Sequence, residues 1–237
     1  MKEIRISAKD LGALNMPDFC PKCFWIKRNC KALPFQIFPG IFSSIDSWTK
    51  NLVHAHFAAY NGPPVWLPEA QGAVKCLPSP HWSKFKRTDP VTGITLSGVV
   101  DDIFETAGRR HIIYDYKTAK FTEGQDKLIP MYQAQLNGYA WIGEGCKLDV
   151  EALFMAYFEP VTQKEDCARL LDLGTALCFT VKTVPVEIVS DMIPGLLCRA
   201  KEILDLSVPP PGVDGCKDCE KLRGLLLAVT GDLKWAA

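Results

Sequence analysis

Two acidic side chains and a lysine form the part of the sequence best suited to chemistry. Asp101 follows an apolar run, and Asp115 and Lys117 stand two residues apart near the end of the next one. Two carboxylates brought together repel each other unless a cation binds between them. A few oxygen ligands with room for water and phosphate oxygens suit Mg²⁺ or Mn²⁺. The lysine can hold an attacking water or offset charge that develops on a phosphate.

The two apolar runs, 94–105 and 111–117, predict strands because they are rich in β-branched and apolar residues. The polar link between them contains Gly108, which favours a hairpin turn. A turn centred on Gly108 places Asp101 opposite Asp115, whereas a slip of one residue would send Asp101 to the other face. The expected site therefore depends on the register of this hairpin.

A helix is expected after the hairpin, with Gln135 and Tyr139 four residues apart on one face. Such a pair is commonly ordinary helix surface, and an isolated Asp-x-Lys is commonly a solvated strand edge. Here the apolar residues 112–114 lead directly into Asp115, so the strand is expected to be buried. A buried acid and lysine require partners.

These three segments together resemble a known family. Gly98 to Asp101 (GVVD), Asp115 to Thr118 (DYKT) and Gln135 to Tyr139 (QLNGY) are similar to the G-x-x-D, D-Y-K-T and Q-x-x-x-Y motifs of RecB-like PD-(D/E)XK nucleases. The resemblance implies an α/β (α+β) fold, in which helices flank a central mixed sheet. It also implies metal-dependent hydrolysis of DNA.

The resemblance assigns roles to individual residues. Asp101, Asp115 and the backbone carbonyl of Tyr116 are implied as ligands of Mg²⁺ or Mn²⁺, and Lys117 is implied to orient the attacking water. Gln135 and Tyr139, on the following helix, are implied to position Lys117 or the DNA strand.

A long helix is expected over residues 41–60, with Asp46, His54 and His56 as its polar candidates. In the family, a His or Glu on a helix at this place completes the metal site, and Asp46 is the expected counterpart. The alternatives are that Asp46 is only a first-turn carboxylate favoured by the helix dipole, and that the histidines are ordinary surface or core residues.

The cysteines form a second candidate site. Cys20 and Cys23 make one C-x-x-C pair and Cys216 and Cys219 another, so the four thiolates can close around one metal centre and join the two ends of the chain. Cys30 is a reserve ligand. The remaining cysteines are expected in the core or as bystanders: Cys76, Cys146, Cys167, Cys178 and Cys198.

The segment Cys20 to Trp25 (CPKCFW) resembles the N-terminal ligand segment of the CRISPR-associated and helicase-associated iron–sulfur nucleases. The resemblance implies a [4Fe–4S] cluster, with Zn²⁺ as the alternative. This chain departs from the family pattern because each end supplies two cysteines, rather than one and three. Residues 1–237 are expected to form a single nuclease domain, in which 1–40 and 207–237 make an accessory metal lobe around a 41–206 core.

Composition narrows the function classes. Lys and Arg together number 27, as do Asp and Glu, so there is no overall basic charge and nucleic acid would have to bind local patches. Basic residues beside Trp82 and Phe85 form one candidate patch, and a solvated loop is the equal alternative for this segment. No segment has membrane-spanning length, and the N-terminus does not resemble a signal peptide. Ten cysteines without an export signal favour a reducing, cytoplasmic location.

Further elements complete the expected order: a helix over 7–14 capped by Ser7, strands over 150–158 and 177–189 with a connector at 160–172, a helix over 186–206 interrupted at Pro194, and a helix over 222–229.

The resemblance implies a single-strand DNA exonuclease whose partners are DNA and other nucleic-acid-processing proteins, in CRISPR adaptation, DNA repair or a virus-encoded process. A catalytically inactive nucleic-acid-binding or adaptor protein is the alternative. A thiolate-cluster protein for electron transfer or sensing is a third reading.

Overall fold

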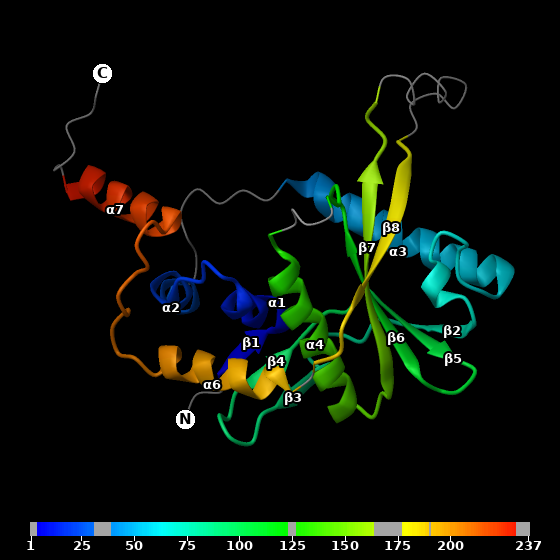
Figure 1. Ribbon diagram of the computed structural model, residues 1–237, viewed down its shortest axis with the longest axis horizontal. Helices are drawn as coiled ribbons and strands as arrows, with labels where there is room; N and C mark the ends of the chain where they lie inside the picture. Colours follow the sequence, from blue (N-terminus) through cyan, green and yellow to red (C-terminus); the bar gives the residue numbers. More distant parts are fainter. Residues whose placement is uncertain (1–3, 31–38, 123–126, 164–176, 190, 231–237) are drawn as a thin grey trace.

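The structure, a computed structural model, describes residues 4–30, 39–122, 127–163, 177–189 and 191–230 (Figure 1). It is a mixed α+β arrangement with two mixed sheets flanked by helices. Most of the expected 160–172 connector, and Cys167 within it, lie outside the described residues.

The larger sheet holds the strands on which the sequence motifs lie. Its strand order is β2-β5-β6-β7-β8, with β6 and β7 parallel and the other pairs antiparallel. A parallel pair needs a long crossover, and α4 (Ile129–Gly145) supplies it. The strands are β2 (Ala73–Leu77), β5 (Asp102–Thr106), β6 (His111–Lys117), β7 (Val150–Pro160) and β8 (Phe179–Val186).

The smaller sheet has the order β1-β4-β3. Its strands are β1 (Arg5–Ser7), β3 (Lys86–Thr88) and β4 (Thr95–Ser97). The prediction of a single strand over 94–105 is therefore wrong, because β4 and β5 belong to different sheets. The chain passes between them at Gly98, where a Cβ would lie 2.4 Å from a ring carbon of Tyr139. Only glycine permits this close approach.

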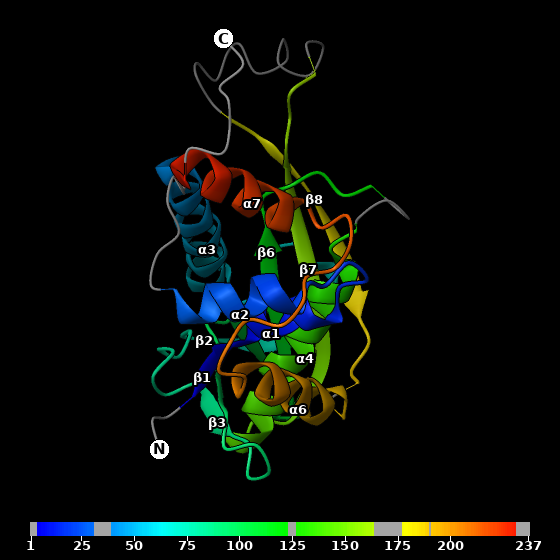
Figure 2. The same ribbon diagram turned by 90° about the vertical axis from the view of Figure 1, so that its left-hand side faces the viewer.

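Helices cover the two faces of the larger sheet and form two hydrophobic cores (Figure 2). On one face α3 (Gly40–Tyr60) buries Val53 and Phe57 against Phe104 and Tyr114. On the other face α4 packs Leu136 and Trp141 against Ile113 and Met155. Because strand side chains alternate, neighbouring residues of β5 and β6 face different helices.

The other helices are α1 (Ala8–Gly12), α2 (Pro21–Asn29), α6 (Met192–Leu204) and α7 (Lys217–Thr230), with short 3₁₀ turns at Ala13–Asn15 and Pro68–Ala70. The Ser7 cap is confirmed, since its Oγ accepts a hydrogen bond from the Asp10 backbone N–H at 3.0 Å. The helix expected from residue 186 begins only at Met192. Pro194 thus falls in the first turn, where a missing N–H breaks no helical hydrogen bond.

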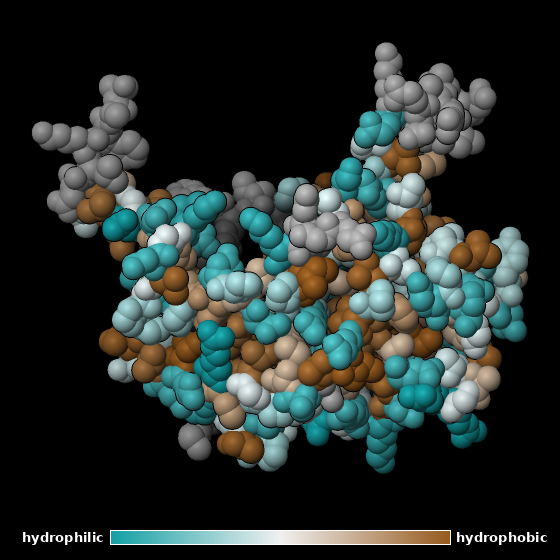
Figure 3. Space-filling model, in the orientation of Figure 1, coloured by the Kyte–Doolittle hydropathy of each residue, from teal (hydrophilic) through white to brown (hydrophobic). Residues whose placement is uncertain are grey.

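On the face shown in Figure 3, hydrophobic and hydrophilic residues are interspersed. Among the described residues, no helix combines the length and apolar character needed to cross a membrane.

Candidate functional site

The hairpin register places the two predicted acids opposite each other. Strands β5 and β6 pair Asp102 with Tyr114 and Ile103 with Ile113. Extending this register by one residue brings Asp101 opposite Asp115. Both side chains are buried, at the end of β6 that leads towards α4.

Asp115 is held by the neighbours that the sequence predicted. Its Oδ1 accepts a hydrogen bond from Gln135 Nε2 at 2.9 Å, and its Oδ2 forms an ion pair with the Lys117 ammonium. Gln135 Nε2 also donates to the Tyr139 hydroxyl at 2.8 Å. The ammonium lies 4.3 Å from the ring centroid of Tyr132. Residues from β6 and α4 therefore converge on one carboxylate.

Two oxygens at this place remain without a hydrogen bond. In the described part of the chain, the buried side-chain polar atoms without a hydrogen-bond partner are Asp115 Oδ2 and Gln135 Oε1. The Asp115 oxygen has only its ionic contact with Lys117. Gln135 Oε1 is thus the acceptor without a polar partner; such buried acceptors are uncommon in proteins, and this one suits a water or a hydrated cation.

Asp101 is tied to both the sheet and α3. Its Oδ2 accepts from the Tyr116 backbone N–H at 2.7 Å, and its Oδ1 pairs with the Lys50 ammonium at 2.8 Å. Burial, together with the charge of Asp115, raises the pKa of Asp101 to about 6, although Lys50 opposes the shift. The pKa of Lys50 is also raised: burial works against this, but Asp101 and Asp46 outweigh it.

Asp46 lies near this site without joining the other two acids directly. It pairs with Lys50 at 2.8 Å, and Lys50 bridges it to Asp101. Asp46, Asp101 and Asp115 are not among the sets of described residues whose ligand atoms all lie within 4.8 Å of one another. The first-turn alternative for Asp46 is wrong, because α3 begins six residues earlier at Gly40.

A neighbouring cluster on the other face of the sheet was not predicted. Asp102 Oδ1 contacts His54 Nε2 at 2.5 Å, and its Oδ2 accepts from the Tyr116 hydroxyl at 2.6 Å. Cys76 packs against the hydrophobic core, which agrees with the core alternative for this cysteine, and its Sγ lies 3.8 Å from the same Oδ1. The adjacent acids Asp101 and Asp102 could have indicated this second cluster, because side chains alternate along a strand and adjacent acids therefore point to opposite faces. His56 instead contacts the Gly62 carbonyl.

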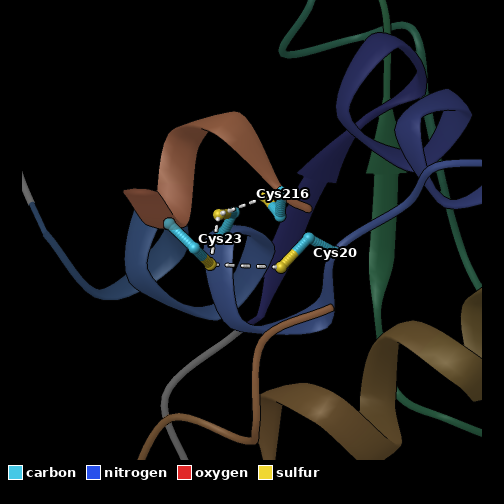
Figure 4. Close-up of side chains that lie close together, drawn as sticks. Cys20, Cys23 and Cys216 are labelled. Atoms are coloured by element: carbon cyan, nitrogen blue, oxygen red, sulfur yellow. Dashed lines mark hydrogen bonds between the residues drawn. The ribbon is translucent and has the colours of Figure 1, made fainter. Parts of the chain in front are cut away.

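The four predicted cysteines are brought together from the two ends of the chain (Figure 4). Cys23 Sγ lies 3.6 Å from Cys216 Sγ and 3.5 Å from Cys219 Sγ, while Cys20 Sγ lies 3.6 Å from Cys219 Sγ. Cys20 immediately precedes α2 and Cys23 lies in its first turn. Cys216 immediately precedes α7 and Cys219 lies in its first turn. Cys30 is exposed and is not a member of this group.

Hydrogen bonds favour a thiolate at one of these positions. Burial raises the pKa of Cys20, but the backbone N–H groups of Cys23 and Val213 and the neighbouring thiols outweigh it and lower the pKa to about 6. Four cysteine sulfurs in contact can bind a metal ion.

The expected basic and aromatic patch is only partly present. Phe85 is 1% exposed and cannot stack on a base, which corrects that prediction. Trp82 is partly exposed, and the Arg5 guanidinium lies 4.0 Å from its ring centroid. Arg87 is engaged with the Trp141 carbonyl and with Glu144.

Comparison of the sequence with models of protein families and with curated proteins found no match. Among solved structures, the crystal structure of SSO0001 is similar to this chain, with a TM-score of 0.51 and 14% identity. The similarity covers 89% of this chain and 81% of that chain. At this identity the likeness concerns the fold alone. Fold and site together define a mixed α+β protein with a buried acid–lysine site and a four-cysteine group.

Proposed function

We propose that this protein is a Mg²⁺- or Mn²⁺-dependent DNA nuclease with a RecB-like PD-(D/E)XK core. The observation that carries the proposal is the convergence of Lys117 and Gln135 on Asp115, with Asp101 opposite in the hairpin register. The buried Gln135 oxygen without a hydrogen bond adds support, because it is an acceptor that a water bound to a cation satisfies.

Asp101, Asp115 and the backbone carbonyl of Tyr116 are the groups that would hold the metal ion. A bound ion would supply Lewis acidity and would lower the pKa of a water. Lys117 orients that water and offsets the charge that develops on the phosphate. Gln135 fixes the Asp115 carboxylate, and Tyr139 in turn contacts Gln135. Single-stranded DNA, cut from an end, is the substrate that the motif resemblance favours.

Cleavage of end-labelled single-stranded DNA with Mn²⁺ tests this proposal. Asp115→Asn and Lys117→Ala are expected to lower the rate by about 100-fold or more, since each removes a group that acts on the reacting phosphate. Asp205→Asn, an acid paired with a lysine on α6, is the matched control and should cut normally. Equal cutting by all four proteins would refute the assigned roles.

Lys50 gives a specific reason to keep the non-catalytic alternative. Its ammonium already pairs with both Asp101 and Asp46, where a divalent cation would otherwise supply the positive charge. In a nucleic-acid-binding or adaptor protein, Lys50 would stay paired with these two acids and no divalent cation would replace it. DNA binding would then be independent of Mn²⁺ and unchanged by Asp115→Asn, which a filter-binding assay can measure.

For the four cysteines we propose Zn²⁺. Thiolates placed ~2.3 Å from a tetrahedral zinc ion lie ~3.8 Å from one another, close to the sulfur spacing in this group. A [4Fe–4S] cluster, expected from the motif resemblance, places four iron atoms between the thiolates and holds them farther apart. Metal analysis and an absorption spectrum of protein purified without oxygen distinguish the two. A brown protein with four iron atoms per chain would overturn the zinc proposal.

A further inference from the structure

The side chains of His54, Cys76 and Asp102 form a separate cluster on the face of the larger sheet covered by α3. Their ligand atoms all lie within 4.8 Å of one another. They come from three elements, α3, β2 and β5, that are far apart in the sequence. None of them belongs to the acid–lysine site or to the four-cysteine group.

We infer that His54, Cys76 and Asp102 form a Zn²⁺ site whose fourth position opens to the surface. An imidazole, a thiolate and a carboxylate are a mixed nitrogen, sulfur and oxygen set that suits zinc better than Mg²⁺ or Ca²⁺. Three protein ligands leave one tetrahedral position for water or another ligand.

The separations need little adjustment for zinc. Ligand atoms around a tetrahedral zinc ion lie ~3.3–3.8 Å apart, and Cys76 Sγ is 3.8 Å from Asp102 Oδ1. His54 Nε2, at 2.5 Å from the same oxygen, must move outward by about 1 Å to reach this spacing. The His54 side chain is 43% exposed, so solvent leaves it room to do so.

Asp102 is held in the orientation that such a site needs. It is fully buried, and the Tyr116 hydroxyl donates to its Oδ2 at 2.6 Å. That hydrogen bond fixes the carboxylate and leaves Oδ1 facing His54 and Cys76. Metal-ligating carboxylates are commonly hydrogen-bonded in this way through their second oxygen.

The open position faces a surface pocket of about 460 Å³ that His54 and Cys76 line. Phe57, Asn61, Lys75 and Pro78 also line it. Zinc reaches the ligands from this side, and the Cys76 thiol releases its proton to water when the sulfur binds. The bound ion joins α3 to β2 and β5.

Zinc stoichiometry after equilibration with Zn²⁺ and removal of excess ion tests the site in the full-length protein. Wild type is expected to bind one zinc more than His54→Ala or Cys76→Ser. Cys198→Ser, which replaces another half-buried cysteine, is the control and should bind as wild type does. Tyr116→Phe is expected to weaken this zinc by about 10- to 100-fold, because it removes the hydrogen bond behind Asp102.

Anomalous scattering at the zinc edge locates the ion independently of the four-cysteine group. A peak bonded to Cys76 Sγ and His54 Nε2 supports the site. Zinc found only at the four cysteines, or an unchanged stoichiometry in both His54→Ala and Cys76→Ser, would overturn it. His54 is half-exposed, so His54→Ala should stay folded, and circular dichroism verifies this. Neither outcome depends on nuclease activity.

Discussion

The two sites predicted from sequence differ in how their negative charge is balanced. At the acid–lysine site each buried carboxylate already has a cation, Lys50 for Asp101 and Lys117 for Asp115. In the four-cysteine group the thiols contact one another, and no lysine or arginine in the described chain forms a hydrogen bond or salt bridge to them. A metal ion could therefore complete the second site, whereas at the first it would have to compete with an ammonium.

This difference suggests a structural role for a metal at the cysteines and a catalytic role for a metal at the acids. Cysteines brought from both chain ends make a site at which a bound metal would stabilise the fold, because it would join the two ends. Carboxylates balanced by lysines make a site that is stable without metal and, under the proposed function, would bind it reversibly. Stability should then depend mainly on the cysteines and catalysis on the acids.

The largest expected effect is on the contact between α2 and α7. Cys219→Ser removes one ligand, so the group should lose its metal and α7 should detach, because the cysteines join these two helices. Amide exchange in α7 is expected to increase by more than about 100-fold, since a structural zinc contributes about 10 kcal/mol or more in small domains. Cys30→Ser is the control. Unchanged exchange in Cys219→Ser would show that packing alone holds α7.

Asp115→Asn should impair DNA cleavage and leave the four-cysteine group intact, unlike Cys219→Ser. Cleavage is expected to fall by about 100-fold or more while the zinc content stays near that of wild type, because Asn keeps the Gln135 contact but not the charge. Parallel activity and metal measurements check this. A variant that also lost zinc would indicate that the two sites are not independent.

The raised pKa of Asp101 gives a pH dependence. Its folded pKa of about 6 lies above the unfolded value of 3.8, so the folded state binds the proton more tightly. The free energy of unfolding of the metal-free wild type should therefore fall by on the order of 3 kcal/mol as pH rises from about 4 to above 6. Asp101→Asn should lack this loss. Urea denaturation of both proteins across that range measures the difference, and parallel curves would contradict it.

The smallest expected effect concerns the competing ammonium. Lys50→Ala frees Asp101 and Asp46, so Mn²⁺ should bind about tenfold more tightly, equivalent to about 1.4 kcal/mol. Calorimetric titration measures this. Lys201→Ala removes a similar pair with Asp205 on α6 and is the matched control. Weaker Mn²⁺ binding in Lys50→Ala would show that Lys50 supports the metal site rather than competing with it.

Local patterns predicted much of this architecture. The periodicity of α3, the apolar strand ending in Asp115 and Lys117, and the i, i+4 pair Gln135 and Tyr139 all follow from short-range sequence. The hairpin register also followed, because the turn at Gly108 is short and leaves few alternatives. The break between β4 and β5 did not, since it depends on the Tyr139 ring that lies against Gly98.

The sequence by itself determined which residues are chemically capable: the acids, the lysine and the two C-x-x-C pairs. Only the tertiary structure decided their partners. Lys50 reaches Asp101 and His54 reaches Asp102 through contacts between α3 and the sheet, and Cys76 reaches Asp102 between the neighbouring strands β2 and β5. These contacts join residues that are 26 to 51 positions apart in the sequence. Such contacts depend on how helices and strands pack, because residues distant in the chain meet only once the sheet and its covering helices have assembled.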